Sequence, residues 1–362
     1  MYDVAIIGAG MAGASLAAEL APHARALVAE AEAHPGYHAT GRSAAFWEEC
    51  YGGPEIVPLT LASGPYLREH GMLSPRGALY IARDEDGAAV DAFMERFAGS
   101  GATIERLGRA QLTRRLPGVR EAWTRAIWQP SCADIDVAAL HQHYLAMARR
   151  AGAEVRTSAR LIAAEREGEG WRLDFGAAGE ARADVLADAA GAWADEVAAL
   201  AGARPLGIAP LRRTVAQLRT DPPPQIDLPL VLDLKGAFYF KPEHGRLWLS
   251  PHDETPSLAC DAAPEEIDVA LAIDRFEQVV DWRVLAVERK WAGLRSFAPD
   301  RRPVYGYDRA REGFFWFAGQ GGYGIQTAPA AARLAAQLLL GRPRDAMTER
   351  LDTALYGPAR FG

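Results

Sequence analysis

Short apolar runs and helix-forming runs alternate at the start of the chain. Val4 to Ile7 is an apolar run typical of a strand, residues 8–13 are GAGMAG, and ASLAAEL at 14–20 favours a helix. A second short apolar run, RALVA at 25–29, ends at Glu30. These lengths and periods predict a β-α-β unit of about 30 residues.

A second helix is predicted over residues 136–150. Asp136 is a suitable N-cap, apolar residues recur at 137, 140, 144 and 147, and Gly152 ends the pattern. Residues 183–202 predict a strand, a turn of small residues and a helix. Residues 313–341 repeat that order, with a glycine-rich loop after the strand and a helix through Leu340.

Other stretches are rich in β-branched and aromatic residues and have little helical period: ALYIA at 78–82, 207–220, 237–250 and 287–307. Within 237–250, Glu243-His-Gly245 predicts a hairpin turn. The chain is therefore expected to leave a nucleotide-binding domain, build an antiparallel sheet and return. We assign residues 1–74, 135–206 and 296–362 to the first domain, and residues 75–134 and 207–295 to a substrate-binding domain.

Composition narrows the class of protein. The chain has 362 residues, 49% hydrophobic and 24% charged, which is typical of a globular protein. The net charge is −7 and no basic block stands out, so nucleic acid is not an expected partner. Three widely separated cysteines form neither a disulfide framework nor a zinc motif, which favours a reducing, cytoplasmic location.

Two segments were considered as membrane or export signals. Asp3 precedes the first apolar run and no basic region accompanies it, so a signal peptide is not expected. Gly313 to Ala332 lacks charge for 20 residues, but it contains five glycines and Pro329, so we expect no membrane span there.

The glycines of the first unit predict a dinucleotide site. Gly8 allows a tight turn, Gly10 lets a pyrophosphate approach the backbone, and Gly13 lets helix and strand pack closely. Glu30 ends the second strand, where its carboxylate suits ribose hydroxyls and disfavours the 2′-phosphate of NADP. These residues alone leave NAD and FAD open.

Four later segments carry a family resemblance: GYHATGRSAAFW at 36–47, ADAAGAWAD at 187–195, WAGLRSFAPD at 291–300 and GQGGYGIQTAPA at 319–330. With the glycine motif, they resemble the D-amino-acid oxidase family of FAD-dependent oxidoreductases, from Tyr2 to about Leu340. Within the family, the segments are most similar to those of bacterial D-arginine dehydrogenases. The resemblance implies an α/β fold (α+β overall), with a Rossmann-like FAD-binding domain interleaved with an antiparallel-sheet substrate domain.

The resemblance also implies which residues contact FAD. Residues 41–44 would run against the flavin ring and pyrophosphate with Ser43 as a donor, Leu161 would meet adenine, and the helix after 321–324 would point at the pyrimidine ring. The implied cofactor residues are Gly8, Gly10, Ala12, Gly13, Glu30, Ala31, Thr40, Gly41, Arg42, Ser43, Ala44, Leu161, Ala190, Gly191, Trp193, Gly321, Gly322, Tyr323, Gly324, Ile325 and Gln326. No cysteine follows Cys260 and His38 is expected to pack or hydrogen-bond, so non-covalent FAD is expected, and no metal.

The same resemblance implies a substrate site. Arg295 matches the main carboxylate-binding arginine of the family, since a guanidinium group suits a carboxylate. Arg213 matches a second arginine, Tyr239 a hydroxyl donor and Tyr51 a tyrosine on the loop over the substrate. Gly322 is placed among the catalytic residues for its position beside the flavin.

The departures from the D-arginine dehydrogenases bear on specificity. Ala78 stands where a glutamate faces the substrate guanidinium, and Phe46 replaces an active-site histidine, with Trp47 next to it. These changes predict a pocket for neutral, bulky side chains. Glu48 complicates this, because it either offers a displaced carboxylate or belongs, with Glu49, to a solvated acidic loop.

The expected function is oxidation of the α-carbon of a D-amino acid, with hydrolysis of the imino acid to a 2-oxo acid. Alternatives are a secondary amino acid or glycine, and a 2-hydroxy acid or glycerol phosphate; a flavoprotein without turnover is disfavoured. The expected partners are the amino acid and an electron acceptor, either a quinone or carrier or oxygen. Nearness to a dehydrogenase favours the quinone or carrier.

Overall fold

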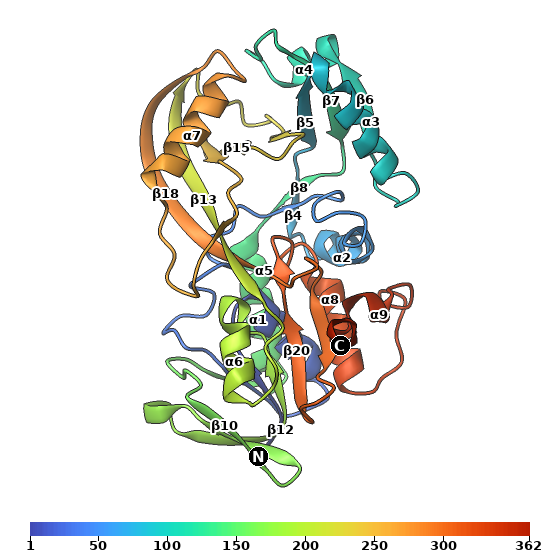
Figure 1. Cartoon of the computed structure of the whole chain (residues 1–362), viewed down its shortest axis with the longest axis vertical. Helices are drawn as coiled ribbons and strands as arrows, with labels where there is room; N and C mark the ends of the chain where they lie inside the picture. Colours follow the sequence, from blue (N-terminus) through green and yellow to red (C-terminus); the bar gives the residue numbers. More distant parts are fainter.

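The computed structural model describes residues 1–362, which form an elongated molecule with one large sheet in each half (Figure 1). The first sheet has eight strands. Its main path, in order, is β10 (Ala163–Glu167), β11 (Gly170–Asp174), β12 (Glu180–Asp188), β1 (Tyr2–Ile7), β2 (Ala26–Ala29) and β9 (Glu154–Arg156). β20 (Phe314–Ala318) runs parallel to β12, and β19 (Val304–Tyr307) runs antiparallel to β20.

Both faces of this sheet are buried, as the apolar run in β1 requires. Val4 and Ile6 join the core beneath α1 (Met11–Leu20), α5 (Val137–Arg150) and α8 (Ala328–Leu339), whereas Ala5 and Ile7 join the core on the other face with α6 (Ala194–Leu200). Alternate residues of a strand point to opposite faces. A continuous apolar run therefore predicts a strand covered on both sides, as found.

The second sheet has ten strands. In order, they are β21 (Gln320–Gly321), β18 (Arg283–Phe297), β13 (Ala209–Asp221), β16 (Arg246–Ser250), β15 (Tyr239–Glu243), β14 (Leu230–Asp233), β5 (Ala78–Arg83), β7 (Trp123–Gln129) and β6 (Glu105–Gly108), with β17 (Thr255–Pro256) also on β13. The long antiparallel pair of β13 and β18 connects the upper half to the centre of the molecule (Figure 1).

Helices cover the second sheet as well. α7 (Glu266–Glu277) and α4 (Arg109–Arg115) pack on the face that holds Leu79 and Ile81. Ala78 and Tyr80 of the same strand lie on the opposite face, where α3 (Gly87–Arg96) contributes Val90. This second face turns toward the centre of the molecule and supplies part of the site described below.

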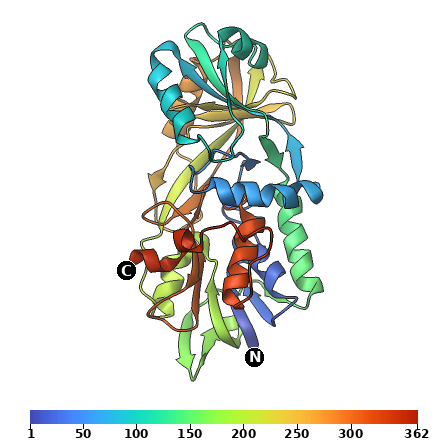
Figure 2. The same ribbon diagram turned by 90° about the vertical axis from the view of Figure 1, so that its right-hand side faces the viewer.

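A small third sheet lies between the two large ones. It consists of β3 (Phe46–Trp47), β8 (Ala133–Ile135) and β4 (Leu73–Pro75). α2 (Val57–Glu69) crosses the middle of the molecule beside it (Figure 2), and the short α9 (Thr353–Tyr356) lies near the C-terminus.

The observed fold agrees with the expected fold class and with most predicted elements. The helix after Asp136 begins with the N-cap bond, Asp136 Oδ1 accepting from Ala139 N at 2.9 Å. The stretch 287–307 departs from prediction, because it divides into β18 of the second sheet and β19 of the first. Every helix is too short or too polar to cross a membrane. The domain boundaries stay a prediction; β21, from the segment assigned to the first domain, pairs with β18 of the second sheet.

Candidate active site

A cavity runs along the junction of the two large sheets. Its walls include the residues that follow β1, β2, β12 and β20, which are the carboxyl ends of parallel strands. Ligands of open α/β sheets bind at this edge. β13, β15 and β18 of the second sheet close the other side of the cavity with Arg213, Tyr239 and Arg295.

The glycine loop after β1 has the geometry that its sequence predicts. Gly8 has φ +99°, a left-handed conformation that favours glycine. A Cβ atom on Gly13 would lie 1.8 Å from Gly8 O, so α1 approaches β1 closely only because residue 13 lacks a side chain. Gly13 does not line the cavity, and its place is between helix and strand.

Glu30 lies at the cavity wall and also holds the glycine loop. Its side chain accepts from Ala9 N at 2.7 Å and from Glu32 N at 2.9 Å. From the other side, His141 Nε2 of α5 donates to Ala9 O at 2.8 Å. His141 was not predicted as a site residue, because a histidine on an apolar helix face gives no sequence signal for a contact with a distant loop.

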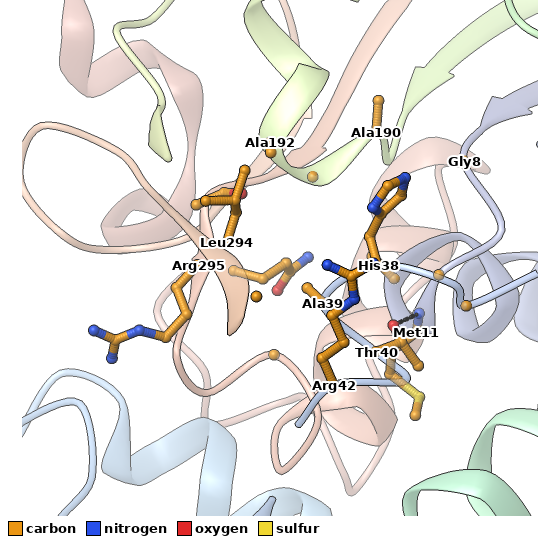
Figure 3. A pocket seen from close by; sticks show the side chains of 18 of the residues that line it. Gly8, Met11, His38, Ala39, Thr40, Arg42, Ala190, Ala192, Leu294 and Arg295 are labelled. Atoms are coloured by element: carbon orange, nitrogen blue, oxygen red, sulfur yellow. Dashed lines mark hydrogen bonds between the residues drawn. The ribbon is translucent and has the colours of Figure 1, made fainter. Parts of the chain in front are cut away.

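Thr40 and Arg42 tie the segment at 36–47 to its surroundings. Met11 N, at the start of α1, donates to Thr40 Oγ1 at 2.9 Å (Figure 3). Arg42 Nη1 donates to Ala262 O at 3.0 Å and Ala292 O at 3.1 Å, and Arg42 Nη2 pairs with Asp261. Arg42 is therefore held by protein groups on its guanidinium while its side chain lines the cavity.

Most of the predicted cofactor residues line this cavity: Gly8, Gly10, Ala12, Glu30, Ala31, Thr40, Arg42, Ser43, Ala44, Leu161, Ala190, Gly191, Trp193, Gly321, Gly322, Gly324, Ile325 and Gln326. Gly13, Gly41 and Tyr323 do not. A Cβ atom on Gly41 would lie 2.7 Å from Gly36 O, and Tyr323 is buried with its hydroxyl donating to Arg301 O. These three residues shape the loops behind the wall.

The predicted substrate residues come together at the second-sheet end of the cavity. Arg295 Nη1 donates to Tyr51 OH at 3.0 Å, and the Arg213 guanidinium lies 5.9 Å from the centre of the Tyr239 ring. The Arg295 and Arg213 side chains are only 12% and 8% exposed. We call Arg213, Arg295, Tyr51 and Tyr239 the clamp.

The clamp keeps unused hydrogen-bond donors. Arg213 Nη2 and Arg295 Nε are buried and have no partner in the protein. Burial and the neighbouring Arg295 lower the pKa of Arg213. Burial opposes the charge of Arg295 too, but Tyr51 and Glu254 outweigh it and raise its pKa. A buried guanidinium with open donors is costly unless an anion binds it, so the clamp suits a carboxylate.

Gly322 lies directly beside the clamp. A Cβ atom there would stand 2.3 Å from Tyr51 OH and 2.9 Å from Arg295 Nη1. The absence of a side chain at residue 322 is what allows Tyr51 and Arg295 to meet at the cavity wall.

An aromatic wall adjoins the clamp. The Phe46 ring is 5.7 Å from Tyr51 and 5.8 Å from Tyr239, centre to centre, and all three residues line the cavity. Of the three residues expected to shape a pocket for neutral, bulky side chains, Phe46 lines the cavity, whereas Trp47 and Ala78 do not. Trp47 turns away, with Nε1 donating to Thr60 O at 3.0 Å, and Ala78 is fully buried in β5.

Glu48 is neither a wall of the cavity nor part of a solvated loop. Glu48 is 0% and Glu49 4% exposed, which corrects both sequence interpretations. The Glu48 carboxyl accepts from Tyr80 OH at 2.7 Å and from Cys50 N at 3.0 Å. Burial raises the pKa of Glu48 to about 7, because no cation compensates its charge.

The cavity residues fit an extended dinucleotide. Gly10 precedes α1 and gives it no side-chain cap. Thr40 accepts from Met11 N, so the N–H groups of residues 12 and 13 and the helix dipole remain for a pyrophosphate. Glu30 and Leu161 stand at one part of the wall and the loop 320–326 at another, beside the clamp. FAD would thus be held by Gly8, Gly10 and Glu30 at its nucleotide half and by the 320–326 loop near the clamp.

Comparisons with known proteins agree with this geometry. The model of the family described as DAO, FAD dependent oxidoreductase, matches residues 3–338. Hydrogen cyanide synthase subunit HcnC of Pseudomonas aeruginosa is 26% identical over 302 residues, 82% of this chain and 70% of that protein. Glycine oxidase of the same organism is 29% identical over 259 residues, 67% of this chain and 65% of that protein. The crystal structure of glycine oxidase from Geobacillus kaustophilus superposes with a TM-score of 0.84 at 24% identity, covering 98% of each chain.

Proposed function

The chain belongs to the DAO family of FAD-dependent oxidoreductases, and from this premise we propose that it oxidises the carbon–nitrogen bond of a small amino acid. The observation that carries the proposal is the clamp, in which two buried arginines keep open donors beside Tyr51 and Gly322. A carboxylate held there lies next to the loop assigned to the flavin.

The residues of the clamp have distinct roles in this proposal. The guanidinium groups of Arg213 and Arg295, which line the cavity, supply charge-assisted hydrogen bonds to the substrate carboxylate. Tyr51 OH accepts from Arg295, so its own proton is available to the substrate. FAD, when bound, supplies the acceptor for the hydride of the α-carbon. Fixing the carboxylate orients that carbon, which lowers the entropic part of the barrier.

The clamp also bears on the protonation of the amine. None of the carboxylates and histidines of the cavity wall hydrogen-bonds to Arg213 or Arg295. Two guanidinium groups near an ammonium raise the energy of its charged form and so lower its pKa. Arg213 and Arg295 thus favour the neutral amine, whose lone pair assists the loss of hydride from the α-carbon.

The aromatic wall favours a small substrate, such as glycine or a secondary amino acid. Phe46 occupies the wall between Tyr51 and Tyr239, and Trp47 and Ala78 do not line the cavity. A glycine oxidase among the relatives fits this size class. The second candidate is a neutral, bulkier D-amino acid, favoured by the apolar surface of Phe46 and Val215. Neither candidate requires the guanidinium recognition of the D-arginine dehydrogenases.

Anaerobic reduction of the bound flavin tests the substrate class. The panel contains glycine, sarcosine, D-alanine, D-proline, D-phenylalanine, D-arginine and glycolate, and the flavin absorbance is followed in time. Glycine, sarcosine, D-alanine or D-proline should reduce the flavin fastest. Fastest reduction by D-arginine or glycolate would contradict the proposal. Admitting oxygen or a quinone to the reduced enzyme then identifies the electron acceptor. We expect a quinone or carrier to reoxidise the flavin faster than oxygen.

The clamp itself is tested by Arg295→Met. Loss of a buried charge-assisted contact should weaken transition-state binding by about 2–5 kcal/mol and lower kcat/KM correspondingly. FAD should stay bound. Arg289→Met is the matched control, because Arg289 lies on the same strand, exposed and away from the cavity. Wild-type kcat/KM in Arg295→Met would show that Arg295 does not hold the substrate.

A further inference from the structure

One loop contacts two parts of the cavity wall, the clamp and Arg42. The segment of residues 251–264, here called the strap, connects β16 to α7 and pairs through β17 with Leu211 and Arg212 of β13. Near its start, Asp253 and Glu254 contact the clamp arginines. Near its end, Asp261 and Ala262 hold Arg42. No sequence motif marked this segment.

Glu254 makes the strongest contacts of the strap with the clamp. Its Oε1 accepts from Arg295 Nη2 at 2.8 Å and lies 3.7 Å from Arg213 Nη2. Arg301 Nη2 donates to both Glu254 oxygens, at 2.8 and 2.9 Å. One carboxylate therefore joins both clamp arginines to a third arginine at the surface. Glu254 does not line the cavity, so it contacts the clamp from behind.

The clamp needs such a partner. Arg213 and Arg295 are both buried, and their like charges repel each other in a medium of low dielectric constant. Asp253 is the other acid at hand, but its carboxylate accepts from Thr214 N at 2.7 Å and Thr214 Oγ1 at 2.9 Å and stands 3.9 Å from Arg213 Nε. Glu254 is the carboxylate that hydrogen-bonds directly to Arg295.

We propose that Glu254 is a positioning residue, which holds Arg295 from behind so that its remaining donors and those of Arg213 face the substrate carboxylate. The inference rests on the proposed function and adds a residue that the family resemblance does not supply. Tyr51 fixes Arg295 Nη1 and Glu254 fixes Nη2, so the guanidinium plane is set by two contacts on two different loops.

The outer support of Glu254 also reaches the cofactor loop. The main-chain oxygen of Arg301 accepts from the hydroxyl of Tyr323, which directly follows Gly322. Arg301 thus connects Glu254 to the loop whose glycine lies against Tyr51 and Arg295. The clamp is braced from the strap and from the loop 320–326 together.

The test compares Glu254→Ala and Glu254→Gln in the FAD-loaded enzyme. Acetate is the probe, because it carries the carboxylate alone, and its Kd follows from the perturbation of flavin absorbance. Glu254→Ala should bind acetate about tenfold more weakly and raise KM by a similar factor, with kcat nearly unchanged. Glu254→Gln keeps an oxygen for Arg295 Nη2 and should lie between alanine and wild type. Glu265→Ala, which removes an acid paired with Arg212, is the matched control.

The outcomes separate this inference from the proposed function. Acetate that fails to bind wild-type enzyme would contradict the clamp itself. Tighter acetate binding in Glu254→Ala would show that Glu254 competes with the substrate, and unchanged binding would show that Arg295 needs no support; either result overturns the positioning role. Thermal unfolding of the same variants tells weaker binding apart from general destabilisation.

Discussion

The surroundings of single side chains near the site depend on burial as much as on position in the sequence. Glu48 illustrates this, because a carboxyl next to an active-site loop is expected to meet solvent or substrate. Its hydrogen bonds to Tyr80 OH and Cys50 N instead close the turn that leads to Tyr51. A buried carboxyl group without a neighbouring cation destabilises the folded protein when it ionises, so its effect on stability depends on pH.

We predict that Glu48 by itself lowers the free energy of unfolding as the pH rises from about 5 to 8, against the opposite contribution of the buried histidines, whose pKa values are lowered. In this window the folded protein keeps the Glu48 proton, because burial raises its pKa to about 7, whereas the unfolded chain, near the usual 4.5, has released it. Protons are then bound more by the folded state, so stability decreases with pH, by up to about 3 kcal/mol. Urea unfolding at pH 5.5 and 8 measures the effect.

Glu48→Gln should remove this pH-dependent contribution to the free energy of unfolding, because the amide cannot ionise. Glu49→Gln provides the matched control, since it changes the adjacent buried acid, which accepts from Thr103 N at 2.6 Å. Equal slopes for wild type and Glu48→Gln would rule out Glu48 as the source.

At this scale the sequence predicted the clamp better than the pocket wall. Arg213, Arg295, Tyr51 and Tyr239 lie on strands or a loop whose direction follows from the motif, and they meet at one end of the cavity. Trp47 could not be placed, because a two-residue strand followed by a turn gives no period from which to tell its side-chain direction.

Helices and strands position the site through contacts between segments that are distant in the sequence, which local sequence patterns do not predict. The main one joins α5 to the glycine loop, where the His141 ring donates to Ala9 O. The ring also lies 2.9 Å from the position that a Cβ atom of Gly36 would take. Burial lowers the pKa of His141, so the ring is neutral near pH 7 and the contact persists there.

We predict that His141→Ala weakens FAD binding about three- to tenfold, because the loop that faces the pyrophosphate loses a buried hydrogen bond. The Kd of FAD is measured by the fluorescence of cofactor added to the apoprotein. His143→Ala is the control on the same helix, where the ring contacts Tyr66 rather than the loop. Equal weakening by both variants would point to a general loss of helix stability.

The elements themselves were predicted where local patterns are strong. The helix at 136–150 and the hairpin around His244-Gly245 follow from a cap, a period and a turn, and both turn residues have positive φ. The strands β3 and β21 were missed, because two residues carry no period and their pairing depends on segments far away in the sequence.

In the whole molecule the cofactor cavity lies between two sheets, and its wall holds two side chains that could bind a flavin covalently, His38 and Cys260. His38 Nε2 is 3.0 Å from Glu32 and its ring packs on Trp193, while Cys260 is the cysteine at the cavity wall. We predict that acid precipitation releases all flavin into the supernatant, as FAD and at one per chain. Chromatography of the supernatant measures this; flavin retained in the pellet would indicate attachment at His38 or Cys260.

The place of β20 in the first sheet has a consequence for how the protein is made. β20 pairs with β12, yet it begins at Phe314, well over a hundred residues after β12 ends at Asp188. At roughly 5–20 residues per second, the ribosome leaves that edge open for roughly 6 to 25 seconds. Until then the partner strand is missing, and the loop at 320–326 does not exist. During this time the nascent chain is exposed to chaperones and to aggregation, and flavin can complete the fold only after residues 314–326 have been made.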